Sequence, residues 1–268
     1  MDALPARTAG SFFERPVAPF LRDVFACLWV HRMPAAASPI IVTPDATIDL
    51  QWIDGKLRIA GPDKDPQIEV LPAGATVVGL RFHPAAAAGW LGVPAADLLE
   101  RRLPLEDLWG TRARRLASQV REFERLADLI GSLERAVERC AAERPPADAR
   151  MRAAYDLVQA RPPPEAPLVP WLGRALDMSE RTLRRRFDAC FGYGPKTLDR
   201  ILRYQSFLRL ARGSGHSTAI LAVEAGYSDQ AHLVRESRRL TGNTPLQIEH
   251  LMKGAANLPA SSPNKPLT

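Results

Sequence analysis

One short segment in the C-terminal half carries three arginines at helical spacing. Residues 177 to 187 read DMSERTLRRRF, a tight turn followed by a helix whose leucine and phenylalanine face inward. The outward-facing positions include Arg181, Arg184 and Arg185. A guanidinium group can hydrogen-bond a guanine edge or bind a phosphate. The segment therefore predicts a nucleic-acid contact, with a solvated basic face as the alternative.

The elements that position these arginines form a helix-turn-helix unit. Residues 169–187 predict two short helices around the turn, with a shared apolar core. Gly173 is small where the helices approach each other, and Ser179 is a favourable N-cap for the second helix. The second helix is therefore the one that presents the arginines.

A second copy of this pattern follows in residues 220–235, ILAVEAGYSDQAHLVR. Its small, turn and cap positions are Ala222, Gly226 and Ser228, each 49 residues after Gly173, Asp177 and Ser179. Glycine at the turn adopts a left-handed backbone at no steric cost. Two units in matching register favour a tandem module over a chance match.

A single long helix is predicted between the two units, from Pro195 to Arg212, with proline in its first turn. About sixteen residues at ~1.5 Å each span roughly 24 Å. A helix of this length can place two recognition helices in successive major-groove segments, which lie about 34 Å apart on one face of DNA.

Residues 147–253 resemble the DNA-binding domain of the AraC/XylS family of transcriptional regulators. The resemblance rests on MSERTLRRRF from Met178, GYGPK from Gly192, GYSDQ from Gly226 and TGNTP from Thr241. It implies a sequence-specific regulator that binds double-stranded DNA, with RNA polymerase as a further candidate partner. The positions that it implies for DNA binding are Arg181, Arg184, Arg185, Gln230, His232, Val234 and Arg235.

The second unit departs from the family pattern at two positions. Ser237 stands where the family usually has an aromatic core residue, and Glu249 where it usually has an arginine. We expect the Ser237 hydroxyl to bind a backbone carbonyl one turn earlier. Ser237→Leu is then predicted to stabilise this unit by roughly 1 kcal/mol through added apolar burial.

Composition favours a globular chain of two domains, because 46% of its 268 residues are hydrophobic and 25% are charged. No run approaches the length of a membrane span and the N-terminus lacks a signal pattern, so a cytoplasmic protein without a membrane partner is expected. Cys27, Cys140 and Cys190 lie far apart without clustered histidines. No disulfide framework, metal or cofactor is therefore expected.

The positive charge is concentrated in the C-terminal region. Residues 1–160 carry a formal net charge of −1, residues 161–253 carry +6, and Lys265 adds +1, which gives the chain its total of +6. A basic domain behind a neutral one is typical of a polyanion-binding module joined to another domain.

The front half predicts a β-rich domain of short strands within residues 22–82, with a type I′ hairpin at Asp54-Gly55. We expect an α+β chain with four parts: a β-rich sensor or dimerisation domain (1–110), a helical connector (111–146), an all-α DNA-binding domain (147–256) and a disordered tail (257–268). The motifs PDATIDL, AGP, GLRFHP and LGVPAADL also resemble a group of regulators in the same family.

A small-molecule effector is a candidate partner of the front half. Trp29, Trp52, Phe82 and Trp90 are the aromatic residues that could line a pocket, or they could be simple core. Trp29, Arg81 and His83 are the predicted ligand-binding residues. An architectural DNA-binding protein without a ligand is the alternative.

The connector is expected to form one helix over residues 112–143, with an apolar stripe from Leu116 to Val137. The stripe packs on its own domain or forms a homodimer surface. A further helical segment is expected over residues 94–101.

An enzyme is the competing class, through a cupin-like metal site in the β-rich half. Only His31 and His83 lie there, too few for a three-histidine site, and no catalytic dyad, phosphate loop or nucleophile elbow is present. No catalytic or metal-binding residue is therefore predicted, although a mixed site built from Asp45, Asp49 or Glu69 stays open.

Overall fold

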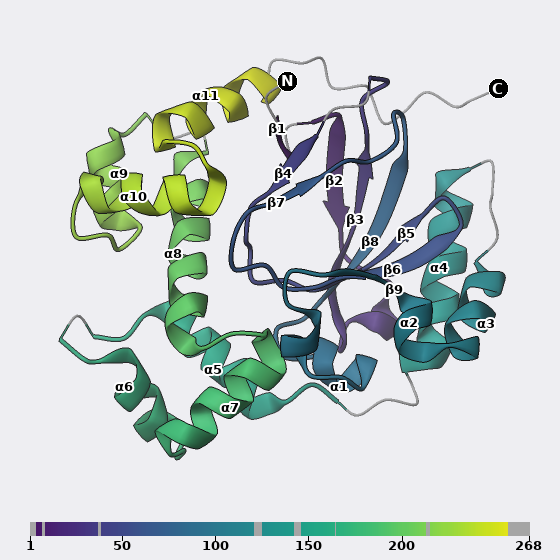
Figure 1. Cartoon of the computed structure of the whole chain (residues 1–268), viewed down its shortest axis with the longest axis horizontal. Coiled ribbons are helices and arrows are strands. Elements are labelled where there is room, and N and C mark those ends of the chain that lie inside the picture. Colours follow the sequence, from purple (N-terminus) through teal and green to yellow (C-terminus); the bar gives the residue numbers. More distant parts are fainter. Residues whose placement is uncertain are drawn as a thin grey trace.

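The chain folds around a six-stranded antiparallel sheet in a computed structural model (Figure 1). The structure describes residues 4–6, 9–36, 39–120, 125–141, 146–163, 165–212 and 215–256. The tail predicted at 257–268 lies outside them. In spatial order the strands are β2 (Ser11–Arg15), β3 (Phe25–Arg32), β8 (Thr76–Phe82), β5 (Asp49–Ile53), β6 (Lys56–Ala60) and β9 (Arg102–Pro104).

A smaller sheet lies beside the large one and faces the C-terminal helices (Figure 1). It consists of β1 (Leu4–Pro5), β4 (Ile40–Val42) and β7 (Gln67–Glu69). The predicted hairpin joins β5 to β6, with φ of 46° at Asp54 and 79° at Gly55, as a type I′ turn requires. The β-rich half is confirmed.

Helices cover the other face of the large sheet and one of its ends, where two of them also contact the C-terminal domain (Figure 1). They are η2 (Pro19–Leu21), α1 (Ala87–Leu91), η3 (Ala95–Leu98), α2 (Leu105–Trp109), α3 (Thr111–Gln119) and α4 (Leu126–Ala141). Trp52, Phe82 and Trp90 lie in the core between sheet and helices. These three aromatic residues therefore do not line a pocket next to Trp29.

The single helix predicted over residues 112–143 is wrong, because α3 and α4 are separate. Backbone at Val120 is extended, and the Ser132 hydroxyl donates to the carbonyl oxygen of Gln119 at 3.0 Å. Folding back lets both helices bury apolar residues in the same core, among them Leu116, Ile130 and Val137. The stripe therefore packs internally, as the first of the two interpretations expected.

The helix predicted over residues 94–101 is also wrong beyond its first turn. Only η3 forms, since Glu100 has φ of 57° and its N–H donates to the carbonyl oxygen of Pro62. The chain then enters β9, which pairs with β6. This arrangement brings Arg102 to the edge of the sheet.

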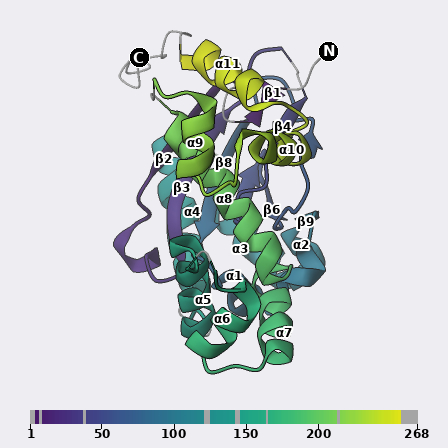
Figure 2. The ribbon, with the colours of Figure 1, turned by 90° about the vertical axis from the view of Figure 1, so that its left-hand side faces the viewer.

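The C-terminal region is all-helical, with two helix-turn-helix units at opposite ends of α8 (Figures 1 and 2). Its helices are α5 (Ala149–Ala160), α6 (Leu168–Ala175), α7 (Glu180–Phe191), α8 (Pro195–Ala211), α9 (Thr218–Glu224), α10 (Gln230–Thr241) and α11 (Pro245–Ala256). The predicted α+β class and the long joining helix are confirmed. Within the described ranges no helix is both long and apolar enough to cross a membrane.

The second unit has a small polar network inside its core. Ser237 is fully buried, and its hydroxyl donates to the carbonyl oxygen of Asn243 at 2.8 Å and lies 3.1 Å from the Tyr204 hydroxyl. The partner expected one turn earlier is therefore wrong. Tyr204 on α8 supplies an aromatic ring to this core, so the space beside Ser237 is already filled.

We now expect Ser237→Leu to destabilise the protein by about 1–3 kcal/mol, the opposite of the sequence-based prediction. The larger side chain overpacks the core and removes the Ser237 hydroxyl that lies within hydrogen-bond distance of the Tyr204 hydroxyl. Chemical denaturation of the full chain, beside Ser237→Ala, checks this. A leucine variant more stable than the alanine variant would show that the core has room.

Candidate functional site

Helix α7 presents the predicted arginines on an open face. The Ser179 hydroxyl accepts the N–H of Thr182 at 3.2 Å, which caps the helix as predicted. Leu183 and Phe187 are fully buried. The exposed residues of the helix include Arg181, Arg184 and Arg185.

The turn before α7 is tight because the backbone at Gly173 closely approaches the backbone at Met178. A Cβ at Gly173 would lie 2.9 Å from the carbonyl oxygen of Met178, so the close approach requires glycine. Asp177 takes φ of 49° at the turn. Both positions have the roles that the sequence predicted.

Arg186 differs from its neighbouring arginines, since its guanidinium binds Asp148. Asp148 also caps α5 by accepting the N–H of Met151 at 3.2 Å. Arg186 therefore holds α7 against α5.

Helix α10 is the matching helix of the second unit. Its N-cap is Asp229, which accepts the N–H of His232 at 2.7 Å, so the cap predicted at Ser228 is one residue too early. Ser228 instead contacts the His232 ring at Nδ1, 3.2 Å away. Of the residues predicted to bind DNA, Gln230 and Arg235 are exposed, whereas His232 and Val234 are partly buried.

Arg161 joins the end of α5 to the second unit. Its Nη1 donates to the carbonyl oxygen of Glu224, at the end of α9, over 3.4 Å. A Cβ on Gly226 would lie 2.2 Å from the same nitrogen, so the guanidinium packs directly on the turn of the second unit. Arg161 itself has φ of 70°, a conformation that is costly for a residue with a side chain.

A cavity of about 170 Å³ lies between the sheet and the C-terminal helices. Its apolar lining includes Phe12, Trp29, Ile40, Leu71 and Val77. Gln205, Leu208, Arg212, Thr241 and Ile248 contribute from the C-terminal domain. Gln205 fixes this contact by donating to the carbonyl oxygen of Pro44 at 2.7 Å.

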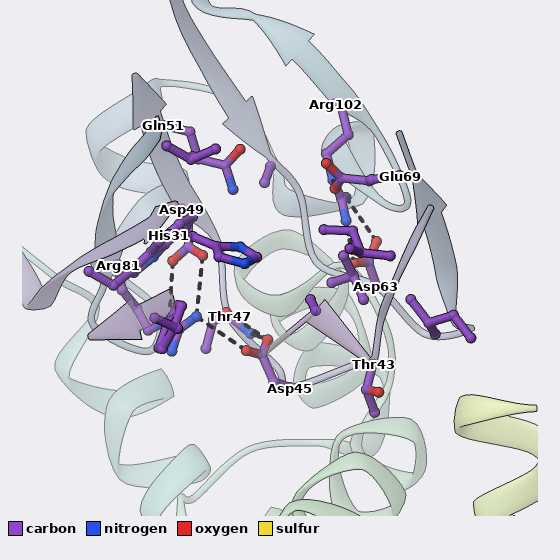
Figure 3. Close-up of a pocket in the computed structure, with 18 of the residues that line it drawn as sticks. His31, Thr43, Asp45, Thr47, Asp49, Gln51, Asp63, Glu69, Arg81 and Arg102 are labelled. Carbon is purple, nitrogen blue, oxygen red and sulfur yellow. Dashed lines mark hydrogen bonds and ion pairs between the residues drawn. The ribbon is translucent and has the colours of Figure 1, made fainter. Parts of the chain in front are cut away.

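One charged cluster of the cavity centres on Arg81 (Figure 3). Its Nε lies 3.1 Å from Asp49 Oδ1, and its Nη2 lies 3.3 Å from Asp45 Oδ2. Burial alone would lower the pKa of Arg81, but Asp49 and Asp45 outweigh it and raise the pKa above its ordinary value. The guanidinium therefore stays charged and fully engaged.

A second cluster lies on the opposite side of the cavity (Figure 3). Arg102 binds Asp63 at 2.7 Å and Glu69 at 2.6 Å, while Arg58 binds Glu69 at 2.7 Å. Burial raises the pKa of Asp63 to about 6, although Arg102 acts in the other direction. Burial alone would also raise the pKa of Glu69, but Arg58 and Arg102 hold it below its ordinary value.

Two of the three predicted ligand-binding residues, Trp29 and Arg81, line this cavity. His83 lies elsewhere, in a small hollow beside Phe191, where its Nε2 lies 2.9 Å from the carbonyl oxygen of Arg22. Burial lowers the pKa of His83. No sequence pattern indicated Arg58, Arg102 or the residues of the C-terminal wall, because only folding brings these distant segments together.

The mixed metal site left open by the sequence does not assemble. Asp45 and Asp49 bind Arg81, whereas Glu69 binds Arg58 and Arg102. Across the part of the chain that the structure describes, no group of three or more histidine, cysteine, aspartate or glutamate residues could hold a metal ion.

Two family models match the sequence. Residues 172–250 match a model described as a helix-turn-helix domain. Residues 14–104 match one described as a domain of unknown function (DUF6597). A comparison with curated proteins found no significant match.

Several solved structures are similar to the chain at low identity. An apo variant of ToxT from Vibrio cholerae strain SCE256 is 9% identical, with 88% of this chain and 99% of that chain covered and a TM-score of 0.49. Wild-type ToxT with a bound unsaturated fatty acid, from the same strain, is 10% identical, with 91% and 95% covered and a TM-score of 0.42. The transcriptional regulator CdpR from Pseudomonas aeruginosa is 20% identical, with 67% and 46% covered and a TM-score of 0.32.

These TM-scores are below 0.5, so classification rests on the sequence match and the observed units. The matched region, 172–250, contains α7, α8 and α10. Two capped helix-turn-helix units lie at the ends of one long helix and carry the motifs MSERTLRRRF, GYGPK, GYSDQ and TGNTP. Residues 172–250 therefore form a helix-turn-helix domain of the AraC/XylS type, the type found in transcriptional regulators.

Proposed function

We propose that the protein is a sequence-specific regulator that acts in the cytoplasm and contacts two successive major-groove segments of DNA with α7 and α10. The observation that carries this proposal is the pair of capped recognition helices at the two ends of α8, each with an exposed polar or basic face. Such an arrangement lets one chain contact adjacent segments without a partner subunit.

The two helices have different chemistry for this task. Helix α7 offers guanidinium groups at Arg181, Arg184 and Arg185, which suit guanine edges and phosphates. Helix α10 offers Gln230 and Arg235 on its exposed face, with His232 and Val234 beside them. Glutamine suits adenine, so the two segments of the site should differ in preferred bases.

The cavity is the proposed effector site. Its walls come from both domains, so a bound molecule would contact the sheet and also Thr241 and Ile248, which lie at the end of α10 and in α11. An effector that binds one arrangement of these walls more tightly would shift the orientation of the second unit. DNA affinity would then depend on occupancy of the cavity.

Selection from a random DNA pool by the full chain tests this proposal. We expect a bipartite motif whose two blocks lie about 10 base pairs apart, one turn of the duplex. Affinity for the selected site should fall steeply with salt concentration. A motif with a single block, or no enriched motif, would contradict the two-segment proposal.

The contact made by Arg161 leads to a prediction about how strictly the spacing of the two DNA blocks is recognised. Arg161→Gly keeps the positive φ but removes the bond to Glu224, so the second unit can shift relative to the first. We expect the affinity ratio between the best spacing and one base pair more or less to fall roughly fivefold, the effect of about one hydrogen bond. Arg150→Ala, at an exposed position near the start of α5, serves as the control. Unchanged spacing preference in the glycine variant would exclude this role.

A further inference from the structure

We propose that the cavity binds an uncharged small molecule that has a hydrogen-bond acceptor next to an apolar ring or chain, the chemistry of an amide or a neutral cyclic carbonyl compound. This inference rests on the proposed function, because it names the class of effector for the site described there. It follows from which polar groups of the cavity are already engaged and which are not.

The charged groups of the cavity wall are engaged with one another. Arg81 binds Asp45 and Asp49, and Arg102 and Arg58 share Glu69 and Asp63 between them. Arg212, at the C-terminal wall, is also engaged. A charged ligand would therefore have to break an existing ion pair or stay buried without a counter-ion, and both are costly.

Gln51 provides the clearest free group. The residue is only 6% exposed, and its Oε1 accepts a hydrogen bond from Arg58 Nε at 2.7 Å. That bond fixes the amide so that its nitrogen points into the cavity (Figure 3). Among the described residues, no acceptor binds this nitrogen, so two N–H donors are available to a ligand.

His31, on β3, is a second polar group that lines the cavity. Its ring is 4% exposed and reaches into the cavity (Figure 3). One ring nitrogen, Nε2, donates to the carbonyl oxygen of Ala9, which leaves Nδ1 of the neutral ring as an acceptor. A primary amide has both complementary groups, since its oxygen can accept from Gln51 and its N–H can donate to His31.

The other lining of the cavity favours an apolar body on the ligand. Trp29 packs directly on the backbone of Gly79, where a Cβ would lie 2.1 Å from its ring, and it is joined by Ile40 and Leu71. Apart from the indole N–H of Trp29, these three side chains cannot hydrogen-bond to the hydroxyl groups of a polyol ligand. An apolar ring with a single amide group matches the lining better than a polyol.

Three probes of the same size separate ligand charge from ligand shape: benzamide, benzoate and benzylamine. We expect ligand-observed NMR with the full chain to show benzamide binding, with benzoate and benzylamine at least tenfold weaker. Gln51→Glu keeps an acceptor for Arg58 but loses the amide N–H groups, so benzamide affinity should fall at least fivefold. Gln119→Glu, on α3 and away from the cavity, should leave it unchanged.

Several outcomes would overturn this inference. They are binding of benzoate or benzylamine equal to or tighter than that of benzamide, no detectable binding of benzamide, or unchanged benzamide affinity in a folded Gln51→Glu variant. Because these measurements contain no DNA, their failure is distinct from a failure of the selection experiment. If the chain selects a bipartite DNA site but does not bind benzamide, the DNA-binding proposal stands and the proposed ligand class is wrong.

Discussion

Arg184→Ala or Arg185→Ala is expected to remove the preference for a defined base pair in the block contacted by α7. An arginine that pairs with a guanine edge discriminates against the wrong base by about 1–3 kcal/mol, or roughly 5- to 150-fold. Both side chains are exposed, and among the described residues the one ion pair that either forms is the exposed contact of Arg184 with Glu180 at 3.6 Å. Stability should therefore change little.

The measurement compares motifs selected by each folded variant at one salt concentration. Arg186→Ala is the matched control on the same helix, because Arg186 binds Asp148 and holds α7 in place. It should lower stability or overall affinity without changing the preferred bases. Should both Arg184→Ala and Arg185→Ala select the wild-type motif, α7 contacts phosphates only.

Arg102→Met is expected to lower the free energy of unfolding by about 3–5 kcal/mol. Asp63 and Glu69 have side chains only 7% and 12% exposed, so they would lose a shared counter-ion in a buried place. The Arg102 side chain also links β9 to β7, and therefore the large sheet to the small one. A fall in melting temperature of about 10 °C corresponds to this loss.

The loss of unfolding free energy caused by Arg102→Met should become smaller as the pH falls from about 8 to about 5. Burial already raises the pKa of Asp63 to about 6, and loss of Arg102 would raise it further. A carboxyl group whose pKa is higher in the folded state is destabilising while ionised, and acidification relieves this cost. Arg101→Met, an exposed neighbour, is the control and should show neither effect. If the loss of unfolding free energy is the same at every pH, lost packing and not the unpaired carboxylates explains the destabilisation.

The sequence predicted the C-terminal domain more accurately than the cavity. Local signals define a helix-turn-helix: Ser179 caps a helix, Gly173 permits a close approach, and Pro195 begins the long helix. These signals act within a few residues of one another. Errors there were small, such as the cap at Asp229 in place of Ser228.

The cavity depends on contacts between distant segments, which periodicity does not show. Arg102 was expected just after a helix, but it lies in a strand that pairs with β6 and meets Asp63 and Glu69 from another loop and sheet. Ser237 is a similar case, since Tyr204 from α8 fills the space that the family pattern assigns to an aromatic residue in α10.

Protection of guanine N7 by the full chain on its selected DNA tests the central claim most directly. N7 lies in the major groove, so its protection from methylation reports contact by a recognition helix. We predict two protected segments about one helical turn apart on one face of the duplex, with Arg184→Ala or Arg185→Ala exposing guanines in only one of them. Protection of a single segment by the wild-type chain, or loss of both segments in each folded variant, would contradict it.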